Sequence, residues 1–157
     1  MSLVDPAFRN LAGPPSLASC TRDIYSADTR FTLDTTLGIA HGIASAAQHL
    51  HSKGIMHGDL YAHNILHNDE GDCLLGDFGA ASFFPPQDQP IALALQRIEV
   101  RAFGCLLEEL IERCDAHNEM QDILNALRHL QINCAQADSA ARPLFSGILR
   151  VLEELRN

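Results

Sequence analysis

The stretch "HGDLYAHNILHNDEGDCLLGDFG", residues 57–79, governs how the rest of the chain is interpreted. Two short apolar runs, "ILH" and "CLLG", flank "NDEGD", whose Asn, Asp and Gly residues favour a turn. The pattern predicts a small β-hairpin over residues 65–76. Asn64 precedes the first strand and Asp77 follows the second, so antiparallel pairing should bring them to neighbouring strand ends, about 5 Å apart.

These polar residues at one end of the hairpin are candidates for a metal site. Asn64 offers an amide oxygen and Asp77 a carboxylate. Mg²⁺ prefers hard oxygen ligands, with few from the protein and the rest from water and phosphate. Asp59, in the loop just upstream, can accept a proton from an attacking hydroxyl. The simplest alternative is that all three are turn and cap residues around a hairpin.

The order of these residues resembles a known family. H-x-D-x-x-x-x-N at residues 57–64, followed by D-F-G at 77–79, resembles the catalytic loop and metal-binding motif of protein kinases. "VRAFGCLLEEL" resembles the long central helix of the kinase C-terminal lobe, and "ARPLF" the Arg-Pro step before its last helix. "HGDLYAHNIL", "DFGAAS" and "EVRAFG" are most similar to the kinase domains of bacterial leucine-rich repeat proteins.

The resemblance implies ATP- and Mg²⁺-dependent phosphoryl transfer to a Ser or Thr hydroxyl, with ATP and a protein substrate as partners. In that case Asp59 is the catalytic base. Asn64 and Asp77 hold Mg²⁺ on the nucleotide phosphates, and Leu66 forms part of the floor under the adenine. Tyr61 stands where Ser/Thr kinases usually have a phosphate-contacting Lys, which leaves the class of acceptor open.

The chain departs from the family pattern before the catalytic loop. It contains no GxGxxG loop and no VAIK-like strand, and its single lysine, Lys53, falls at the end of a predicted helix. The sequence therefore predicts that the N-terminal lobe is absent. Because electrostatic stabilisation is usually the largest catalytic term, we expect the isolated chain to be a very poor kinase. It would need an N-terminal lobe supplied elsewhere in the parent protein or in trans.

Later departures concern how the loop is supported. Glu99 stands where the family's central helix usually has an Asp that holds the catalytic loop, so the carboxylate is one methylene longer. Gly58 replaces an Arg that in many kinases binds a phosphorylated activation loop. In place of the family's ion pair near the last helix, we expect a hydrogen bond between Gln87 and Arg142.

Two other classes of function remain open. The chain can be a noncatalytic pseudokinase module that binds a partner through the surface the missing lobe would cover. It can also be a small-molecule phosphotransferase of the aminoglycoside kinase type, which uses a similar HGD loop. The central helix and "ARPLF" argue against that second alternative.

Periodicity predicts a mainly α fold with a small β-hairpin. The resemblance to protein kinases implies that residues 32–157 form a kinase-like C-terminal lobe. Helices are expected from Thr32 or Asp34 to a Gly54 cap, over 93–113, about 118–131, and about 143–156 with Pro143 in its first turn. Residues 1–31 form an extended lead-in from the inter-lobe hinge, with at most a short helix near "SLASC". Gly38 and Gly42 should each cost about 1 kcal/mol in the first helix, which indicates close packing or a weak middle.

Several side chains have simple structural interpretations. His51, near a helix end, can interact with the last carbonyls. The pair at 108–109 is expected to be a solvated acidic face, and Phe83 and Phe84 are expected to face the core. His63 and His67 have the spacing of a metal pair, but the predicted strand gives them no common helix face.

Composition limits the partners. The chain of 157 residues has a net charge of −9 and no Lys/Arg cluster, so nucleic acid is a poor candidate. The five cysteines contain no CxxC pair. There is no basic-then-apolar leader and no run approaching the roughly 18 apolar residues of a membrane span, so the expected location is the cytoplasm, with no membrane partner.

Overall fold

The structure is a computed structural model that describes residues 4–18, 23–85, 87–115 and 120–157. Its helices are α1 (Leu33–Ser52), α2 (Gln89–Glu112), α3 (Gln121–Cys134) and α4 (Phe145–Arg156). Its strands are β1 (Arg9–Asn10), β2 (Ile55–Met56), β3 (Ile65–His67), β4 (Cys73–Leu75) and β5 (Ser82–Phe83), with short 3₁₀ turns η1 (Ala62–Asn64), η2 (Phe78–Ala80) and η4 (Ser139–Ala141). The predicted fold class, mainly α with a small β-hairpin, is confirmed.

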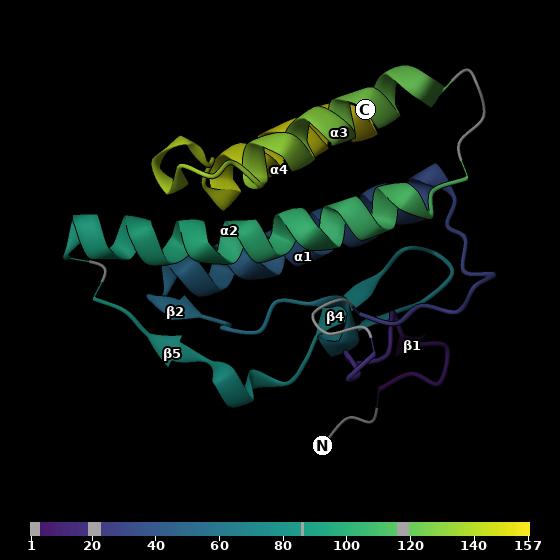
Figure 1. The fold of residues 1–157 in the computed structure, drawn as a ribbon, viewed down its shortest axis with the longest axis horizontal. Helices are drawn as coiled ribbons and strands as arrows, with labels where there is room; N and C mark the ends of the chain where they lie inside the picture. The colour runs from purple at the N-terminus through teal and green to yellow at the C-terminus, as the bar shows by residue number, and fades with distance from the viewer. Residues whose placement is uncertain (1–3, 19–22, 86, 116–119) are drawn as a thin grey trace.

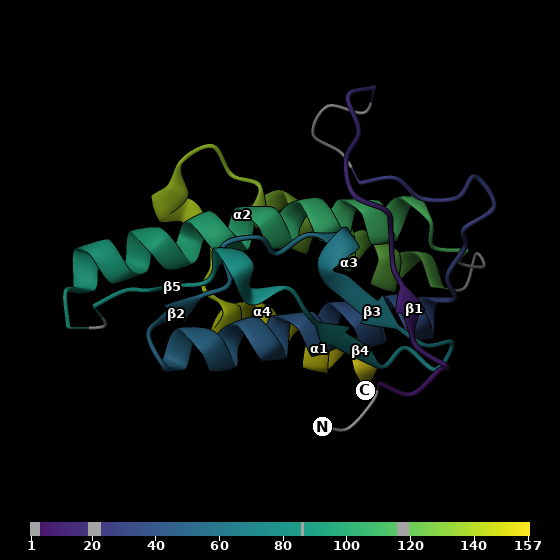
Figure 2. The same cartoon turned by 90° about the horizontal axis from the view of Figure 1, so that it is seen from below.

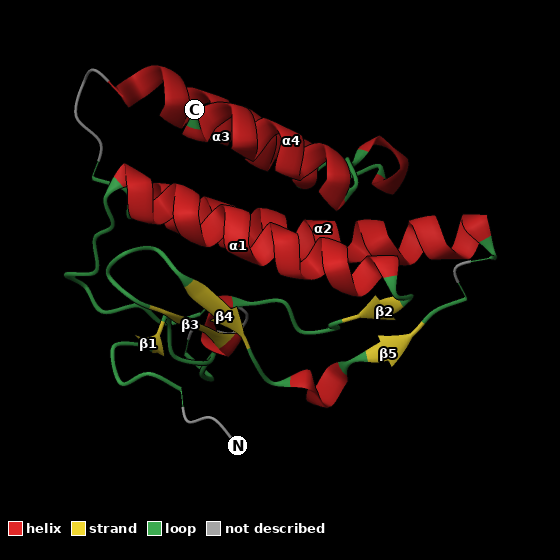
Figure 3. Cartoon of the chain, turned by 180° about the vertical axis from the view of Figure 1, so that it is seen from behind, coloured by secondary structure: helices red, strands yellow, loops and turns green. Residues whose placement is uncertain are grey.

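The elements are stacked in three layers (Figures 1 and 3). Helices α3 and α4 form the first layer, α1 and α2 the second, and the strands with their loops the third, which faces the viewer in Figure 2. Helix α1 packs on α4, and α2 packs on α3. Residues 57–64, the stretch that resembles the kinase catalytic loop, lie in the strand layer. The helical layers therefore support this stretch from beneath.

Helix α1 begins and ends where the sequence predicts. The Thr32 side chain caps its first turn and accepts a hydrogen bond from the Thr35 N–H at 3.1 Å. At the other end, Gly54 has a φ of 70° and donates its N–H to the His51 carbonyl at 3.0 Å. Only glycine adopts this left-handed conformation without strain, so the helix stops here and the chain enters β2.

The core lies between the two helical layers. Phe103 of α2 and Phe145 of α4 are 0% and 1% exposed, and their rings meet edge to face with centroids 5.4 Å apart. Burial of each ring stabilises the fold by about 1.5–3 kcal/mol. Leu107 and Ile43 are also fully buried, which joins α1 and α2 to the same core. Helix α2 therefore supplies part of the centre of the core.

The predicted hairpin is β3 and β4, paired antiparallel with Ile65 opposite Leu75 and Leu66 opposite Leu74. Ile65 is buried, whereas Leu66 is half-buried and Leu74 is exposed, so the two faces of the hairpin differ. Strand β1 pairs with the other side of β3. Within the described residues, part of the lead-in is therefore a strand of the same sheet.

Three predicted helix ends were wrong. Helix α2 begins at Gln89 instead of 93, because Pro90 fits the first turn, where its missing N–H would have no partner. Helix α3 continues to Cys134, and α4 begins at Phe145, which leaves Pro143 outside it. The predicted start of α3 near 118 and residues 19–20 of the possible helix at "SLASC" lie outside the described residues, whereas residues 16–18 are described and are not helical.

The two glycines of α1 mark a close approach of the β3–β4 turn. A Cβ at Gly38 would lie 2.8 Å from the carbonyl oxygen of Gly71, and a Cβ at Gly42 would lie 2.5 Å from Cys73 Sγ. Of the two predicted explanations, close packing is confirmed, although the neighbour is the hairpin and not a helix. The glycines thus allow the hairpin to lie directly on α1.

We expect Gly38→Ala to destabilise the fold by about 1–2 kcal/mol, because overpacking against the rigid Gly71 backbone exceeds the gain in helix propensity. Urea unfolding measures the change. Ser45→Ala, at an exposed position of the same helix, is the matched control and should change stability by less than about 0.5 kcal/mol. A Gly38→Ala variant about 1 kcal/mol more stable than wild type, as propensity alone predicts, would contradict the close packing.

Candidate active site

Asp59 and Asn64 lie together at the start of the hairpin. The Asn64 side-chain Nδ2 donates to the Asp59 carboxylate Oδ2 at 2.8 Å and to the Asp59 backbone carbonyl at 2.9 Å. These bonds orient the amide so that its oxygen lies on the side away from Asp59. Asn64 is 8% exposed, whereas the Asp59 side chain is 39% exposed. Asp59 therefore combines a fixed hydrogen-bond partner with access to a reactant.

The loop that carries Asp59 is held from beneath by Glu99 of α2. Glu99 is 2% exposed; its Oε1 accepts the Gly58 N–H at 2.8 Å and its Oε2 accepts the His57 N–H at 3.3 Å. The predicted role of Glu99 in holding the catalytic loop is thus confirmed in its geometry. Two backbone donors that precede Asp59 are satisfied by one buried carboxylate, which fixes the path of the loop.

His51 of α1 is the third partner of Glu99, with Nε2 2.6 Å from Glu99 Oε2. Burial alone would raise the pKa of Glu99, but hydrogen bonds from His51 and Gly58 and the attraction to His51 together lower it. The expectation that His51 interacts with the last carbonyls of its helix was wrong. Its ring packs edge-on against Phe145 and Phe84, with centroids 5.2 and 6.0 Å away.

The Asp-Phe-Gly turn lies beside His57. His57 Nε2 is 2.8 Å from the Gly76 carbonyl, and its Nδ1 is 3.3 Å from the Asp59 backbone N–H. One neutral tautomer, protonated at Nε2, satisfies both contacts. The His57 ring also meets Phe78 edge to face at 4.8 Å. His57 thus joins the catalytic loop to the Asp-Phe-Gly turn.

Asp77 has a φ of 50°, and among the described residues it is the non-glycine residue with positive φ. Its Oδ1 accepts the Gly79 N–H at 3.1 Å, which stabilises this uncommon backbone. Asn64 is opposite Gly76, whose N–H donates to the Asn64 carbonyl at 2.8 Å, and Asp77 is the next residue. The predicted pair therefore flanks the same end of the hairpin, one residue out of direct register.

The side chains of Asn64 and Asp77 are of the kind that binds Mg²⁺, since an amide oxygen and a carboxylate are both hard oxygen ligands. No group of three or more His, Cys, Asp and Glu side chains within the described ranges is arranged to hold a metal ion. A two-ligand site is consistent with that finding, because Mg²⁺ usually takes its other ligands from water and phosphate. Leu66, the predicted floor residue, lies on the adjacent strand β3.

Gly58 is required by the backbone of this loop. Its φ is 82°, and a Cβ would collide with the Ala80 carbonyl oxygen of η2. The replacement of the family's Arg by Gly58 therefore accompanies a close approach of the catalytic loop to the Asp-Phe-Gly turn. An Arg at this position would be strained by the backbone conformation and by this contact.

Several expectations for single side chains were wrong. Arg142 donates to the backbone carbonyls of Gln136 at 2.8 Å and Arg97 at 3.0 Å, and the described contacts do not join it to the exposed Gln87. Phe84 is buried as expected, but Phe83 is 86% exposed.

The acidic pair at 108–109 is not a uniform solvated face. Glu109 is 7% exposed and accepts a hydrogen bond from the Tyr25 hydroxyl at 3.1 Å. Burial and the neighbouring Glu109 carboxylate raise the pKa of Tyr25, whose ring lies under the Arg113 guanidinium at 3.9 Å. This cluster attaches the segment before α1 to the end of α2.

Two residues near the site were not recognised from the sequence as one unit. His63 lies four residues after Asp59, the predicted catalytic base, and Asp23 lies before α1. A contact of 2.8 Å between His63 Nδ1 and Asp23 Oδ1 joins them. His63 is therefore not part of a pair with His67, whose Nδ1 is 3.1 Å from the Asn68 carbonyl. No local pattern around Asp23 signals this partner.

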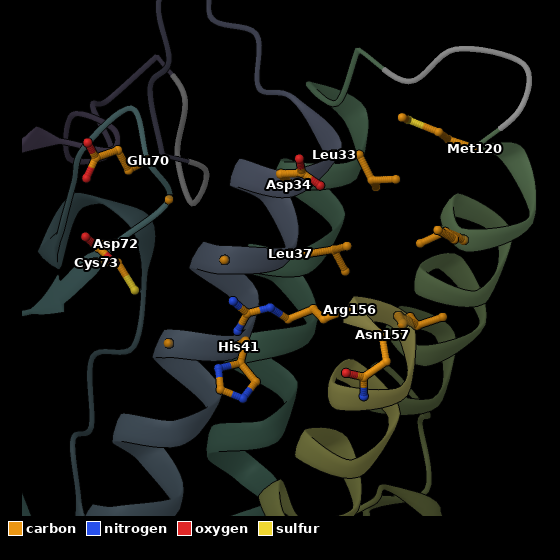
Figure 4. Close-up of a pocket in the computed structure, with 15 residues that line it drawn as sticks. Leu33, Asp34, Leu37, His41, Glu70, Asp72, Cys73, Met120, Arg156 and Asn157 are labelled. Atoms are coloured by element: carbon orange, nitrogen blue, oxygen red, sulfur yellow. The ribbon is translucent and has the colours of Figure 1, made fainter.

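A separate hollow of about 650 Å³ lies between α1, the hairpin turn and the ends of α3 and α4 (Figure 4). Its walls carry acidic side chains from Asp34 and Asp72, a cation at Arg156, and apolar groups such as Leu37. It contains none of the catalytic-loop residues. The candidate active site is instead an open surface of the strand layer.

The fold and the site together define a class of protein. A helical lobe carries, on one side, a loop with the partly exposed Asp59 carboxylate, a hairpin with the Asn64 amide and the Asp77 carboxylate at one end, and an Asp-Phe-Gly turn. These are the parts of a phosphotransferase that positions a nucleotide's phosphates. The class is therefore that of a kinase-like lobe.

Comparison with known sequences gives the family. The protein kinase domain family matches residues 16–98, more than half of the chain, so the chain belongs to the protein kinase family. This family generally uses ATP and Mg²⁺ in phosphoryl transfer to protein substrates. The match includes both the catalytic loop and the Asp-Phe-Gly turn.

Curated relatives include ephrin receptors from several animals. The chain is 27% identical over 169 residues to Ephrin type-B receptor 4a of Danio rerio, covering 82% of this chain and 17% of the relative. It is 26% identical over 167 residues to Ephrin type-A receptor 5 of Rattus norvegicus, with the same two coverages. The chain thus spans about a sixth of the length of these relatives. Within the part that the structure covers, no helix is both long and apolar enough to cross a bilayer.

Proposed function

We propose that this chain forms the C-terminal half of the active site of an ATP- and Mg²⁺-dependent protein kinase. The observation that carries the proposal is the catalytic loop itself. Asp59 is hydrogen-bonded to Asn64 at 2.8 Å, and the loop is bound to the buried Glu99 through the Gly58 N–H at 2.8 Å. A loop that only turned the chain would not need a buried carboxylate beneath it.

Each residue has a chemical role in this proposal. Asp59, partly exposed, accepts the proton of the attacking hydroxyl. Asn64 and Asp77 supply oxygen ligands for Mg²⁺, which neutralises charge on the nucleotide phosphates when bound. Leu66, half-buried on β3, packs under the adenine. The chain thereby binds and orients the reactants from one side.

The other side of the site would come from an N-terminal lobe, in the parent protein or in trans. Lys53, the chain's single lysine, is exposed at the C-cap of α1, and the described contacts do not join it to Asp59 or Asp77. A phosphate-pairing cation would have to come from the completing lobe. Residues 1–31, in this proposal, are the continuation of the hinge between the lobes, and residues 32–157 are the C-terminal lobe.

The finer assignments belong to the same proposal. We expect a Ser or Thr hydroxyl of a protein as the acceptor, although Tyr61 at the edge of the loop departs from that class. "HGDLYAHNIL" and "EVRAFG" favour the kinase domains of bacterial leucine-rich repeat proteins as the subfamily. A cytoplasmic location is part of the same proposal. Phosphorylation of Ser/Thr and Tyr peptides compared side by side would decide the acceptor.

The first test is thermal unfolding with ATP plus Mg²⁺ against ATP plus EDTA. A ligand at about 100 times its dissociation constant adds about 2.7 kcal/mol, which for this size raises the midpoint by roughly 5–10 °C. We expect a Mg²⁺-dependent rise that Asp77→Asn abolishes. Asp88→Asn, the same change at an exposed position before α2, should retain it. No rise with wild type would refute nucleotide binding by this chain.

One observation favours a second function, a noncatalytic partner-binding module. The strand side exposes large apolar side chains: Leu74 is 43% exposed, Phe78 51% and Phe83 86%. Such exposure at one surface is typical of interaction sites. Gel filtration discriminates between the two functions when read with the thermal test. A mass above the monomer and no Mg²⁺–ATP effect would favour the module, whereas a clean monomer would count against it.

A further inference from the structure

The carboxylate of Asp23 is almost completely removed from solvent although it lies in an irregular segment. Its side chain is 3% exposed. Both oxygens are used by one residue: Oδ2 accepts the His63 backbone N–H at 3.1 Å, and Oδ1 is 2.8 Å from His63 Nδ1. Removing a carboxylate from water is unfavourable by several kcal/mol unless it is hydrogen-bonded, so this arrangement is strongly specified.

Backbone pairing places Asp23 beside the catalytic loop. Ile24 and Gly13 exchange two hydrogen bonds of 2.8 and 2.9 Å, and the Leu11 N–H donates to the Ile65 carbonyl at 2.9 Å. The lead-in is therefore bound to the start of β3 through Leu11, and the segment around Ile24 is bound in turn to the lead-in at Gly13. Asp23 reaches His63, forty residues later in the chain, through this continuous set of backbone bonds.

Asp23 also completes the turn that carries the catalytic residues. The 3₁₀ turn η1 contains His63 and Asn64, and its N-cap, Tyr61, provides no side-chain hydrogen bond. The first N–H groups of a helical turn have no partner within the turn. Asp23 supplies that partner from a distant segment. The Asp23 carboxylate therefore acts as an N-cap for η1 and fixes where Asn64 begins the hairpin.

The His63 ring connects Asp23 to Asp59. Its Nδ1 faces Asp23, and its Nε2 lies 3.5 Å from Asp59 Oδ2. The ring is parallel to that of Tyr61, with centroids 6.2 Å apart and an interplanar angle of 7°. Two carboxylates and an aromatic ring thus define the position of the imidazole. A change at Asp23 must be felt at Asp59, although the two do not share a hydrogen bond in the described contacts.

We infer that Asp23 is a positioning residue that acts through His63 to orient Asp59 and Asn64. Its importance for phosphoryl transfer rests on the proposed function. The orientation itself does not, because it is a property of the folded chain without nucleotide. The segment before α1 is then part of the catalytic apparatus, not only a connection to another lobe.

The test is NMR of the ¹⁵N-labelled chain in wild-type, Asp23→Ala and Asp23→Glu forms. In Asp23→Ala we expect the Asn64 side-chain Nδ2 pair and the Asp59 amide to shift by several linewidths. We also expect the His63 amide to exchange with solvent about tenfold faster, as after loss of a charge-assisted hydrogen bond. Asp23→Glu keeps the carboxylate, so its chemical shifts and its His63 exchange rate should lie between those of wild type and Asp23→Ala. Asp28→Ala, in the same segment and exposed, is the matched control and should change none of them.

Unchanged Asn64 and Asp59 signals in Asp23→Ala would overturn the inference. If Asp23→Ala does not fold, Asp23→Asn serves instead, because it replaces one of the two carboxylate oxygens that face His63 with an NH₂ donor. With Asp23→Asn, shifts confined to His63 would also overturn it. Addition of Mg²⁺ and ATP to wild type reports separately on the proposed function. Absence of nucleotide-induced shifts would remove that function and leave the positioning result intact.

Discussion

Glu99→Ala is expected to destabilise the fold by about 3–5 kcal/mol, the range for removal of one partner of a buried charged pair. Glu99 is 2% exposed, and its carboxylate is bonded to His51 and to two backbone N–H groups of the catalytic loop. Alanine would leave these three donors buried without a partner. Urea unfolding of wild type and variant measures the loss.

Two further variants of α2 separate the possible causes. Glu99→Gln keeps the volume and one acceptor, and should lose less stability than alanine. Glu112→Ala, also on α2, removes a carboxylate that is 60% exposed and 3.5 Å from Arg113, and should cost less than about 1 kcal/mol. Equal effects at positions 99 and 112 would show that Glu99 does not support the loop.

The stability difference between wild type and Glu99→Gln should also depend on pH in a defined direction. The pKa of Glu99 is lowered in the folded state. The contribution of Glu99 to the free energy of unfolding is therefore fully present above its pKa in the unfolded chain, about 4.3 for Glu. This contribution disappears as the pH falls through the pKa of Glu99 in the folded state. We therefore expect the two unfolding free energies to converge below about pH 4 and to differ most near neutral pH.

Asp59→Asn is expected to reduce phosphoryl transfer by about 10²–10⁴-fold when the chain is completed by an N-terminal lobe. The asparagine oxygen can still accept the hydrogen bond from Asn64 Nδ2, now 2.8 Å from Asp59 Oδ2, so the loop should stay in place. The proton acceptor for the attacking hydroxyl would be lost. Transfer of labelled phosphate from ATP to Ser/Thr and Tyr peptides measures the change.

Asp122→Asn is the control for that measurement, since Asp122 is exposed in the first turn of α3. It should leave the rate within about twofold, as expected for a surface position. A rate for Asp59→Asn within threefold of wild type would exclude Asp59 as the base. If the Mg²⁺–ATP effect on unfolding is also absent, the partner-binding module becomes the better description of the chain.

Local patterns in the sequence were sufficient for much of the fold. The period of apolar residues in α1, the Thr32 cap and Gly54 all depend on neighbours within a few positions, so they could be recognised without a structure. The hairpin followed from "NDEGD" between two apolar runs. The spacing of Asp59, Asn64 and Asp77 identified the candidate site, because these three lie around one hairpin.

Errors arose where local signals were incomplete. The helix over 93–113 was predicted to begin too late, because Pro90 occupies the first turn of α2, where proline is tolerated. Phe83 and Phe84 are adjacent on the chain, but successive residues of an extended segment point to opposite sides, and only Phe84 is buried. A pair of like residues therefore does not share one environment.

The contacts that support the site depend on tertiary packing. His51 meets Glu99 at a separation of 48 residues, and Asp23 meets His63 at a separation of 40. Nothing local determines which of 20 acidic side chains pairs with which of 8 histidines. A buried polar group must find its partner among whatever the packed helices and strands bring within about 3 Å. The spacing of the candidate catalytic residues could therefore be recognised in the sequence, whereas the groups that orient them became visible only in the folded protein.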